Sequence, residues 1–158
     1  MKTLILYGSK TGTTELCANK IRANLGLHEV DIMDVKKSKK QDLSQYETVI
    51  IGTPLYMGQI TGPIKKYLEL HHNELMEKKL YFFICGLALG QEGVDLFQKQ
   101  ISSSLFAHAS QIKQLGGDIH LDRLNPLYKW MMKKILAKDQ PKLGLLEGEI
   151  AEFSSSIS

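Results

Sequence analysis

The chain opens on Lys2-Thr3-Leu4-Ile5-Leu6-Tyr7-Gly8, and the polar segment Ser9-Lys10-Thr11-Gly12-Thr13-Thr14 follows at once. A short apolar run that ends at glycine predicts a β-strand buried on both faces. A segment rich in Ser, Thr and Gly just before an amphipathic run predicts the N-terminus of a helix. The polar segment is therefore expected at the carboxyl edge of a parallel sheet.

The chemistry of residues 9–14 favours a phosphate group as ligand. Hydroxyl side chains, glycines and the free N–H groups of a helix's first turn can surround a phosphate with donors, and the helix dipole adds attraction. The segment lacks the Gly-Lys-Ser/Thr triplet of nucleoside triphosphate loops and the Gly-x-Gly-x-x-Gly of dinucleotide sites. We therefore expect one terminal phosphate monoester, and the alternative is that Thr13 or Thr14 simply caps the helix.

Strand and helix patterns alternate along the rest of the chain. Further strands are predicted at Glu29–Met33, Thr48–Gly52, Leu80–Cys85 and near Asp118–Asp122. Helices are predicted at Thr13–Leu25, from Pro63, at about Val94–Ala107, from Asn125, and at Glu147–Phe153. Alternation of this kind with short turns predicts an α/β fold with a doubly wound parallel sheet.

Length and composition are consistent with one domain over residues 1–158. Apolar residues make up 43% and charged residues 23% of the chain, and no apolar run reaches the length of a membrane span. We expect the N-terminus to enter the first strand directly and not through a signal peptide. We expect a cytoplasmic protein. A net charge of +3 is mild, and we expect no nucleic-acid partner. The cysteines at 17 and 85 are expected to be free buried thiols, and no metal site is expected.

Residues 9–14, placed after an N-terminal strand, resemble the FMN-phosphate loop of flavodoxins, whose pattern is Ser/Thr-x-Thr-Gly-x-Thr. The resemblance implies a flavodoxin-like five-stranded sheet in the order 2-1-3-4-5, with FMN at the switch point between strands one and three. It also implies that the peptide at Gly58 reorients so that a carbonyl accepts a hydrogen bond from the reduced flavin.

In this fold the loops after strands one, three and four meet in one cleft. Apolar side chains of the second and third loops can form the walls that a flat ring needs, with Tyr56 as the candidate for stacking or, alternatively, as an ordinary half-buried tyrosine. The predicted FMN-binding residues are Ser9, Lys10, Thr11, Gly12, Thr13, Thr14, Thr53, Pro54, Leu55, Tyr56, Met57, Gly58, Gly86, Leu87, Ala88 and Leu89.

Two features separate the chain from an ordinary electron-carrier flavodoxin. One is its excess of basic over acidic residues, because electron carriers usually meet positively charged partners with an acidic face. The other is an inserted basic amphipathic helix at about residues 125–138. Its segment Leu127–Leu136 is similar to the insertion of the menaquinone-dependent protoporphyrinogen oxidases, flavodoxin-like enzymes of haem synthesis. Met1–Leu6 and the turn Met57-Gly58-Gln59 also resemble that family.

This second resemblance implies an FMN-dependent oxidoreductase that passes electrons from a porphyrinogen-type substrate to a quinone. The alternatives are a soluble flavodoxin that transfers electrons to a redox-partner protein, and a scaffold without ligand. The basic helix that bears Trp130 is expected to contact the inner face of the cell membrane peripherally. The alternative is that it packs on the protein's own core or in a homodimer.

Overall fold

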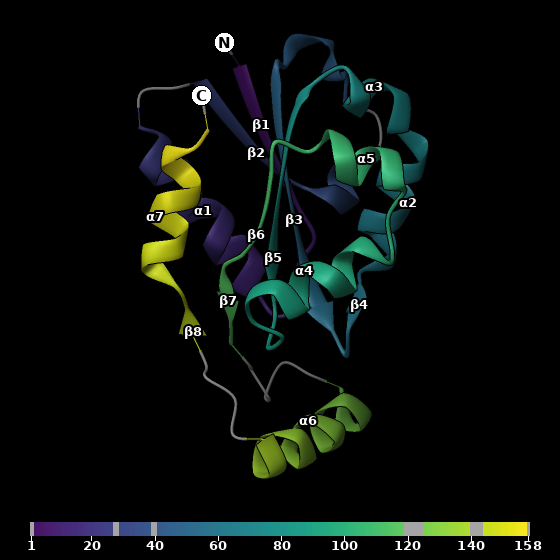
Figure 1. Cartoon of the computed structure of the whole chain (residues 1–158), viewed down its shortest axis with the longest axis vertical. Coiled ribbons are helices and arrows are strands. Elements are labelled where there is room, and N and C mark those ends of the chain that lie inside the picture. The colour runs from purple at the N-terminus through teal and green to yellow at the C-terminus, as the bar shows by residue number, and fades with distance from the viewer. Residues whose placement is uncertain (1, 27–28, 39–40, 119–124, 140–143, 158) are drawn as a thin grey trace.

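The protein is a parallel sheet with helices on both faces, and Figure 1 shows these layers in the computed structural model. The structure describes residues 2–26, 29–38, 41–118, 125–139 and 144–157. Both ends of the chain lie at one end of the molecule, and helix α6 (Pro126–Asp139) lies at the other.

The main sheet has the strand order β2-β1-β3-β5-β6, and all neighbours in this order pair in parallel. The strands are β1 (Lys2–Tyr7), β2 (Glu29–Asp34), β3 (Thr48–Tyr56), β5 (Lys79–Cys85) and β6 (Gln111–Gln114). This order confirms the predicted flavodoxin-like sheet, because β4 (Gln59–Ile60) is only a short antiparallel addition to the end of β3.

The central strands are buried because both of their faces are covered. In β1, Leu4 and Leu6 pack into the cluster on one face, while Ile5 and Tyr7 pack into the cluster on the other. This alternation follows from the two-residue period of a strand, and it explains the continuous apolar run in the sequence.

Helices divide between the two faces of the sheet. Helices α1 (Thr13–Leu25) and α7 (Glu147–Ser155) cover one face. The other face is covered by α2 (Gly62–Leu70), α3 (His72–Met76), α4 (Gly90–Gln98) and α5 (Ser103–His108), with the short helical turns Val35–Lys37 and Leu43–Gln45. The two apolar clusters on either side of the sheet form the core.

The prediction of the last strand of the sheet near Asp118–Asp122 was wrong. That strand is β6 at Gln111–Gln114, a polar edge strand whose Lys113 forms ion pairs with Glu149 and Glu152 of α7. Gly116–Gly117 forms the short strand β7, which pairs with β8 (Gly144–Leu145). Residues 119–122 of the predicted strand lie outside the described part of the chain.

Two other boundaries differ from the sequence prediction. The helix predicted at Val94–Ala107 is divided into α4 and α5, because Ser102 caps a new helix by accepting a hydrogen bond from the Leu105 amide at 3.2 Å. Strand β3 continues beyond Gly52 to Tyr56, because its last residues pair with β4. Part of the predicted second ligand loop is therefore a strand.

Helix α6 occupies the position predicted for the basic helix, and it lies across the carboxyl end of the sheet (Figure 1). The side chains of Ile135 and Leu136 are outside the described part of the chain. Among the described residues, no helix has the length and apolar character needed to cross a membrane.

Gly52 tests the packing of the sheet. A Cβ atom at this position would lie 2.0 Å from Cζ of Phe83, whose ring lies over the glycine on the neighbouring strand. We expect Gly52→Ala to lower the free energy of unfolding, measured in urea, by about 1–3 kcal/mol.

The matched control is Gly148→Ala in α7, where a Cβ meets no atom within 4 Å. That substitution should raise the free energy of unfolding by about 0.5–1 kcal/mol through helix propensity. Equal stabilities of the two variants would mean that Phe83 does not lie over Gly52.

Candidate functional site

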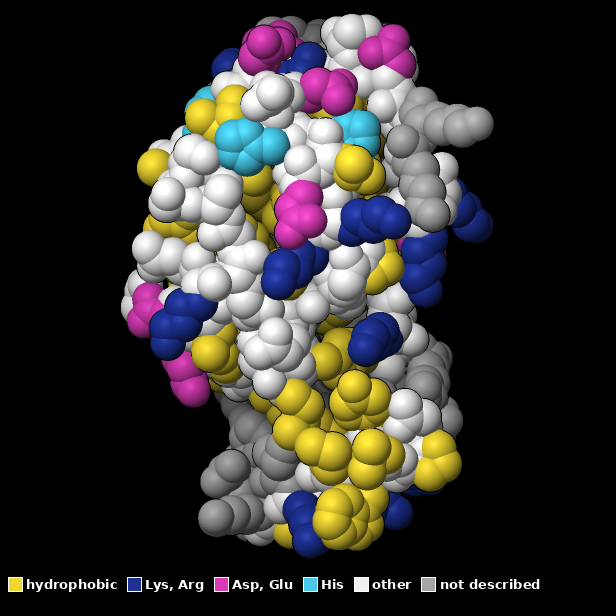
Figure 2. Space-filling view, turned by 90° about the vertical axis from the view of Figure 1, so that its right-hand side faces the viewer, with side chains coloured by type: hydrophobic (Ala, Val, Ile, Leu, Met, Phe, Trp, Pro, Cys, Tyr) yellow, Lys and Arg dark blue, Asp and Glu magenta, His cyan; other side chains and the backbone are white. Residues whose placement is uncertain are grey.

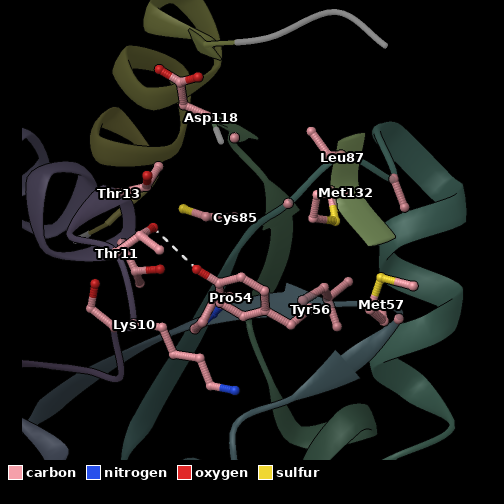
Figure 3. A pocket seen from close by; sticks show the side chains of 17 residues that line it. Lys10, Thr11, Thr13, Pro54, Tyr56, Met57, Cys85, Leu87, Asp118 and Met132 are labelled. Carbon is pink, nitrogen blue, oxygen red and sulfur yellow. Dashed lines mark hydrogen bonds between the residues drawn. The ribbon is translucent and has the colours of Figure 1, made fainter. Parts of the chain in front are cut away.

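A cavity of about 250 Å³ lies at the carboxyl edge of the sheet, where the chain leaves β1, β3 and β5. Figure 3 shows side chains from these segments pointing into it. The lining residues are Ser9, Lys10, Thr11, Thr13, Thr14, Pro54, Leu55, Tyr56, Met57, Gly58, Cys85, Gly86, Leu87, Ala88, Gly117, Asp118 and Met132.

The cavity brings together all of the predicted binding residues except Gly12, Thr53 and Leu89. Thr53 is fully buried within β3, and its hydroxyl donates to the carbonyl of Pro54 at 3.1 Å. Leu89 is the N-cap residue of α4. Gly12 is the N-cap residue of α1.

The loop between β1 and α1 places donors around one corner of the cavity. Gly12 is the N-cap residue of α1 with a φ of 96°, and its amide donates to Oγ of Ser9 at 3.0 Å. No side chain caps this helix, so neither Thr13 nor Thr14 has the capping role that the sequence left open. The hydroxyl of Thr13 is buried without a hydrogen-bond partner, and Thr14 is 1% exposed. The first-turn N–H groups of α1 and these hydroxyls therefore suit an anion.

Tyr56 joins two walls of the cavity. Its hydroxyl donates to Oγ1 of Thr11 at 3.1 Å, as the dashed line in Figure 3 shows. Burial raises the pKa of Tyr56, and the bond to Thr11 lowers it in part, so the phenol stays protonated at neutral pH. The Nζ atom of Lys10 lies 5.0 Å from the centre of the Tyr56 ring and 5.4 Å from that of Tyr128 in α6.

The turn between β3 and β4 forms another wall and has an unusual backbone. Met57 has a φ of 51° and Gly58 a φ of 78°, which are the left-handed conformations of a two-residue hairpin. Gln100 holds this turn from outside: its Nε2 donates to the Gly58 carbonyl at 2.7 Å, and its Oε1 accepts from the Ile60 amide at 2.9 Å. The carbonyl of Gly58 therefore points to Gln100 in this structure.

The third wall depends on close contact between two backbone segments. A Cβ on Gly117 would lie 2.7 Å from the Gly86 nitrogen, so β7 can approach the end of β5 only because residue 117 is glycine. Gln114 fixes the contact by donating to the Gly86 carbonyl at 2.7 Å and accepting from the Gly116 amide at 2.6 Å.

Four lining residues were missed by the sequence prediction: Cys85, Gly117, Asp118 and Met132. Cys85 was assigned to the strand core, although it is the last residue of β5. Gly117 and Asp118 could have been found if β6 had been placed correctly, because their segment leaves the same sheet edge. Met132 comes from α6, and its buried side chain has no local sequence signal.

Comparison with known proteins places the chain in a family. A family model described as a flavodoxin domain matches residues 4–142. The chain therefore belongs to the flavodoxin-domain family.

Individual relatives agree with this assignment. The chain is 33% identical to a flavodoxin of Haemophilus influenzae over 52% of its length, a match that spans only about half (48%) of that relative. It is 29% identical to flavodoxin 1 of Shigella flexneri over 89% of its length and 78% of the relative's.

Solved structures show the same fold. The Streptococcus pneumoniae TIGR4 flavodoxin aligns with a TM-score of 0.61 at 13% identity, covering 99% of this chain and 97% of that one. The Fusobacterium nucleatum flavodoxin bound to flavin mononucleotide aligns with a TM-score of 0.58 at 13% identity, covering 99% and 96%. At these identities the likeness is one of fold alone.

The role of Gln100 can be tested through the backbone amide that it binds. We expect Gln100→Leu to increase the hydrogen-exchange rate of the Ile60 amide about tenfold, because one net hydrogen bond is lost. Gln91→Leu is the control, since Gln91 donates to the exposed side chain of Asp95 within α4 at 2.7 Å. Unchanged exchange at Ile60 would contradict the role assigned to Gln100.

Proposed function

We propose that the chain binds FMN in this cavity and works as an electron-transfer flavoprotein. The observation that supports this most is the buried, unpartnered hydroxyl of Thr13 at the N-terminus of α1. A buried hydroxyl without a partner is costly, and a phosphate oxygen at this corner would accept its hydrogen bond. Membership of the flavodoxin-domain family and a relative solved with flavin mononucleotide support the same ligand.

The two ends of the cavity fit the two ends of FMN. Ser9, Thr11, Thr13 and Thr14 would hold the phosphate together with the first-turn amides of α1. The opposite walls carry Leu55, Tyr56, Met57 and Leu87, which offer the apolar surface that a planar ring requires. Lys10 would add positive charge near the phosphate.

In this proposal the protein positions the cofactor, and FMN when bound supplies the electron chemistry. The walls exclude water from the ring, and the protonated Tyr56 keeps the phosphate loop against β3 through Thr11. The physiological partner would be a redox protein in the cytoplasm, and residues 1–158 would act as a single domain. Among the described residues, no cluster of His, Cys, Asp or Glu suits a metal ion.

Removing two hydroxyls from the phosphate corner tests the ligand assignment. We expect Thr11→Ala combined with Thr14→Ala to raise the Kd for FMN about 100-fold or more, because each hydrogen bond to a charged group contributes about 1.5–3 kcal/mol. The measurement is fluorescence quenching of FMN on titration with the apoprotein.

Thr3→Ala combined with Thr48→Ala is a matched control. These two threonines are buried and pair with each other at the amino ends of β1 and β3, away from the cavity. The control should keep the wild-type Kd. If the cavity variant also kept it, the phosphate would lie elsewhere.

A second candidate function is a quinone-linked FMN oxidoreductase of the protoporphyrinogen oxidase type, and the surface of α6 favours it. Leu127 is 64% exposed and Trp130 is 56% exposed, and Nζ of Lys134 lies 3.9 Å from the centre of the Trp130 ring. Figure 2 shows hydrophobic side chains gathered at this end of the molecule, with basic side chains beside them. Exposed apolar and basic groups on one helix suit an anionic lipid surface.

Trp130 is the only tryptophan in the chain, so its fluorescence reports contact of α6 with lipid. We expect a blue shift with vesicles that contain phosphatidylglycerol and a smaller one with phosphatidylcholine alone. Leu127→Gln should weaken binding to the anionic vesicles about tenfold or more through the lost apolar transfer.

Leu70→Gln is the control for this experiment, because Leu70 is 68% exposed on α2. Equal partition of all three proteins would exclude the membrane role. A dimer that buries Trp130, seen by sedimentation, would assign the patch to a homodimer.

Anaerobic oxidation of protoporphyrinogen with a menaquinone analogue separates the two candidate functions. Turnover supports the oxidase, and its absence with FMN bound supports the electron carrier.

A further inference from the structure

The only two cysteines of the chain lie together beside the cavity, and the proposed function does not use them. Cys17 is on the inner face of α1, one turn after the helix begins, and it is fully buried with Ala18 and Ile21. Cys85 is the last residue of β5, and its side chain belongs to the same apolar cluster. Both residues are thus at the carboxyl edge of the sheet and on the same face.

The two side chains belong to one buried apolar cluster, in which α1 packs directly against β5. A hydrogen bond to Cys85 and burial both raise the pKa of the Cys17 thiol, so Cys17 stays protonated. Neither cysteine is joined in a disulfide in this structure.

The two sulfur atoms differ in their access to small molecules. Cys85 is 3% exposed and lines the cavity, and Figure 3 shows its sulfur among the lining side chains. Cys17 is 0% exposed, with the ion pair between Lys20 and Glu147 on the outer side of the same helix. A small oxidant that enters the cavity can therefore reach Cys85 and not Cys17.

We propose that Cys17 and Cys85 form a reversible disulfide when a peroxide enters the cavity, and that a ligand in the cavity protects them. In the first step the Cys85 sulfur attacks one peroxide oxygen and the O–O bond breaks. The other oxygen leaves as water or an alcohol with the Cys85 proton, and Cys85 becomes a sulfenic acid. In the second step the Cys17 sulfur attacks the Cys85 sulfur, the S–S bond forms, and the sulfenic oxygen leaves as water with the Cys17 proton. The two thiols lose two electrons in total and the peroxide gains them.

The position of the bond links it to the state of the site. It would tie the first turns of α1, which follow the phosphate loop, to the end of β5, which precedes the third wall. Oxidation would therefore indicate that the cavity is empty, and the disulfide would hold the site in that state. The protection by FMN rests on the proposed function, whereas the disulfide itself does not.

The test compares the full-length chain with and without saturating FMN, each treated with hydrogen peroxide. FMN binding is verified separately by absorbance. In the FMN-free chain we expect an intact mass lower by two hydrogen atoms and a fall from two titratable thiols to none, with both thiols restored by dithiothreitol. With FMN bound the loss of thiols should be about tenfold slower, because the oxidant must await dissociation of the ligand.

Single variants identify the order of the steps. Cys17→Ala should stop at a sulfenic acid on Cys85, which dimedone traps, and Cys85→Ala should leave the Cys17 thiol unreacted over the same period. Circular dichroism verifies that each variant is folded.

The proposal is overturned if the native chain keeps both thiols or gains oxygen atoms without losing two hydrogens, or if Cys85→Ala reacts as fast as the native chain. Equal rates with FMN bound would overturn the protection, and a failure of FMN to bind would count against the proposed function alone.

Discussion

The parallel pairing of β1 with β3 determines where the cavity lies. Tyr7 pairs with Gly52, and the next amide, that of Gly8, donates to the Gly52 carbonyl at 3.0 Å. Beyond this bond β1 turns into the phosphate loop, while β3 continues to Tyr56 and turns back through β4. Because the two strands separate at this level, the first turn of α1 and the side chain of Tyr56 face each other across the space that a ligand needs. The Phe83 ring of β5 packs closely over Gly52 of β3, and this contact holds β5 in place beside β3.

Two kinds of contact hold the walls around this space. The phosphate corner, the hairpin turn and the third wall are fixed by backbone geometry and by buried amide side chains, such as Gln100 and Gln114. Helix α6 is held differently, through buried Met132 and through Lys10 between two tyrosine rings. The same helix exposes Leu127 and Trp130, so α6 both contributes to the cavity wall and presents an apolar surface to solvent.

Local patterns in the sequence predicted the alternation of strands and helices, and the resemblance to flavodoxins implied the sheet order and most of the residues that line the cavity. The strand and turn at residues 2–14 are specific because a buried parallel strand and a helix start each have a strong local signal. The strand β6 was misplaced because a polar edge strand resembles a loop, and its partners, which are β5 and the α7 glutamates that pair with Lys113, lie far away in the chain. The contact between Gly86 and Gly117 and the burial of Met132 depend on tertiary packing, which no local pattern encodes. The resemblance to protoporphyrinogen oxidases rested on the segment Leu127–Leu136, on residues 1–6 and on the turn at residues 57–59, and the family match supports the flavodoxin assignment instead.

The central claim is that a phosphate monoester binds at the N-terminus of α1. Isothermal titration of the apoprotein with FMN and with riboflavin, which has the same ring and no phosphate, tests it most directly. We predict that FMN binds at least about 100-fold more tightly than riboflavin, and that this ratio decreases with added inorganic phosphate. Equal affinities for the two flavins would contradict the claim, because the hydroxyls and amides at this corner would then contribute nothing to binding.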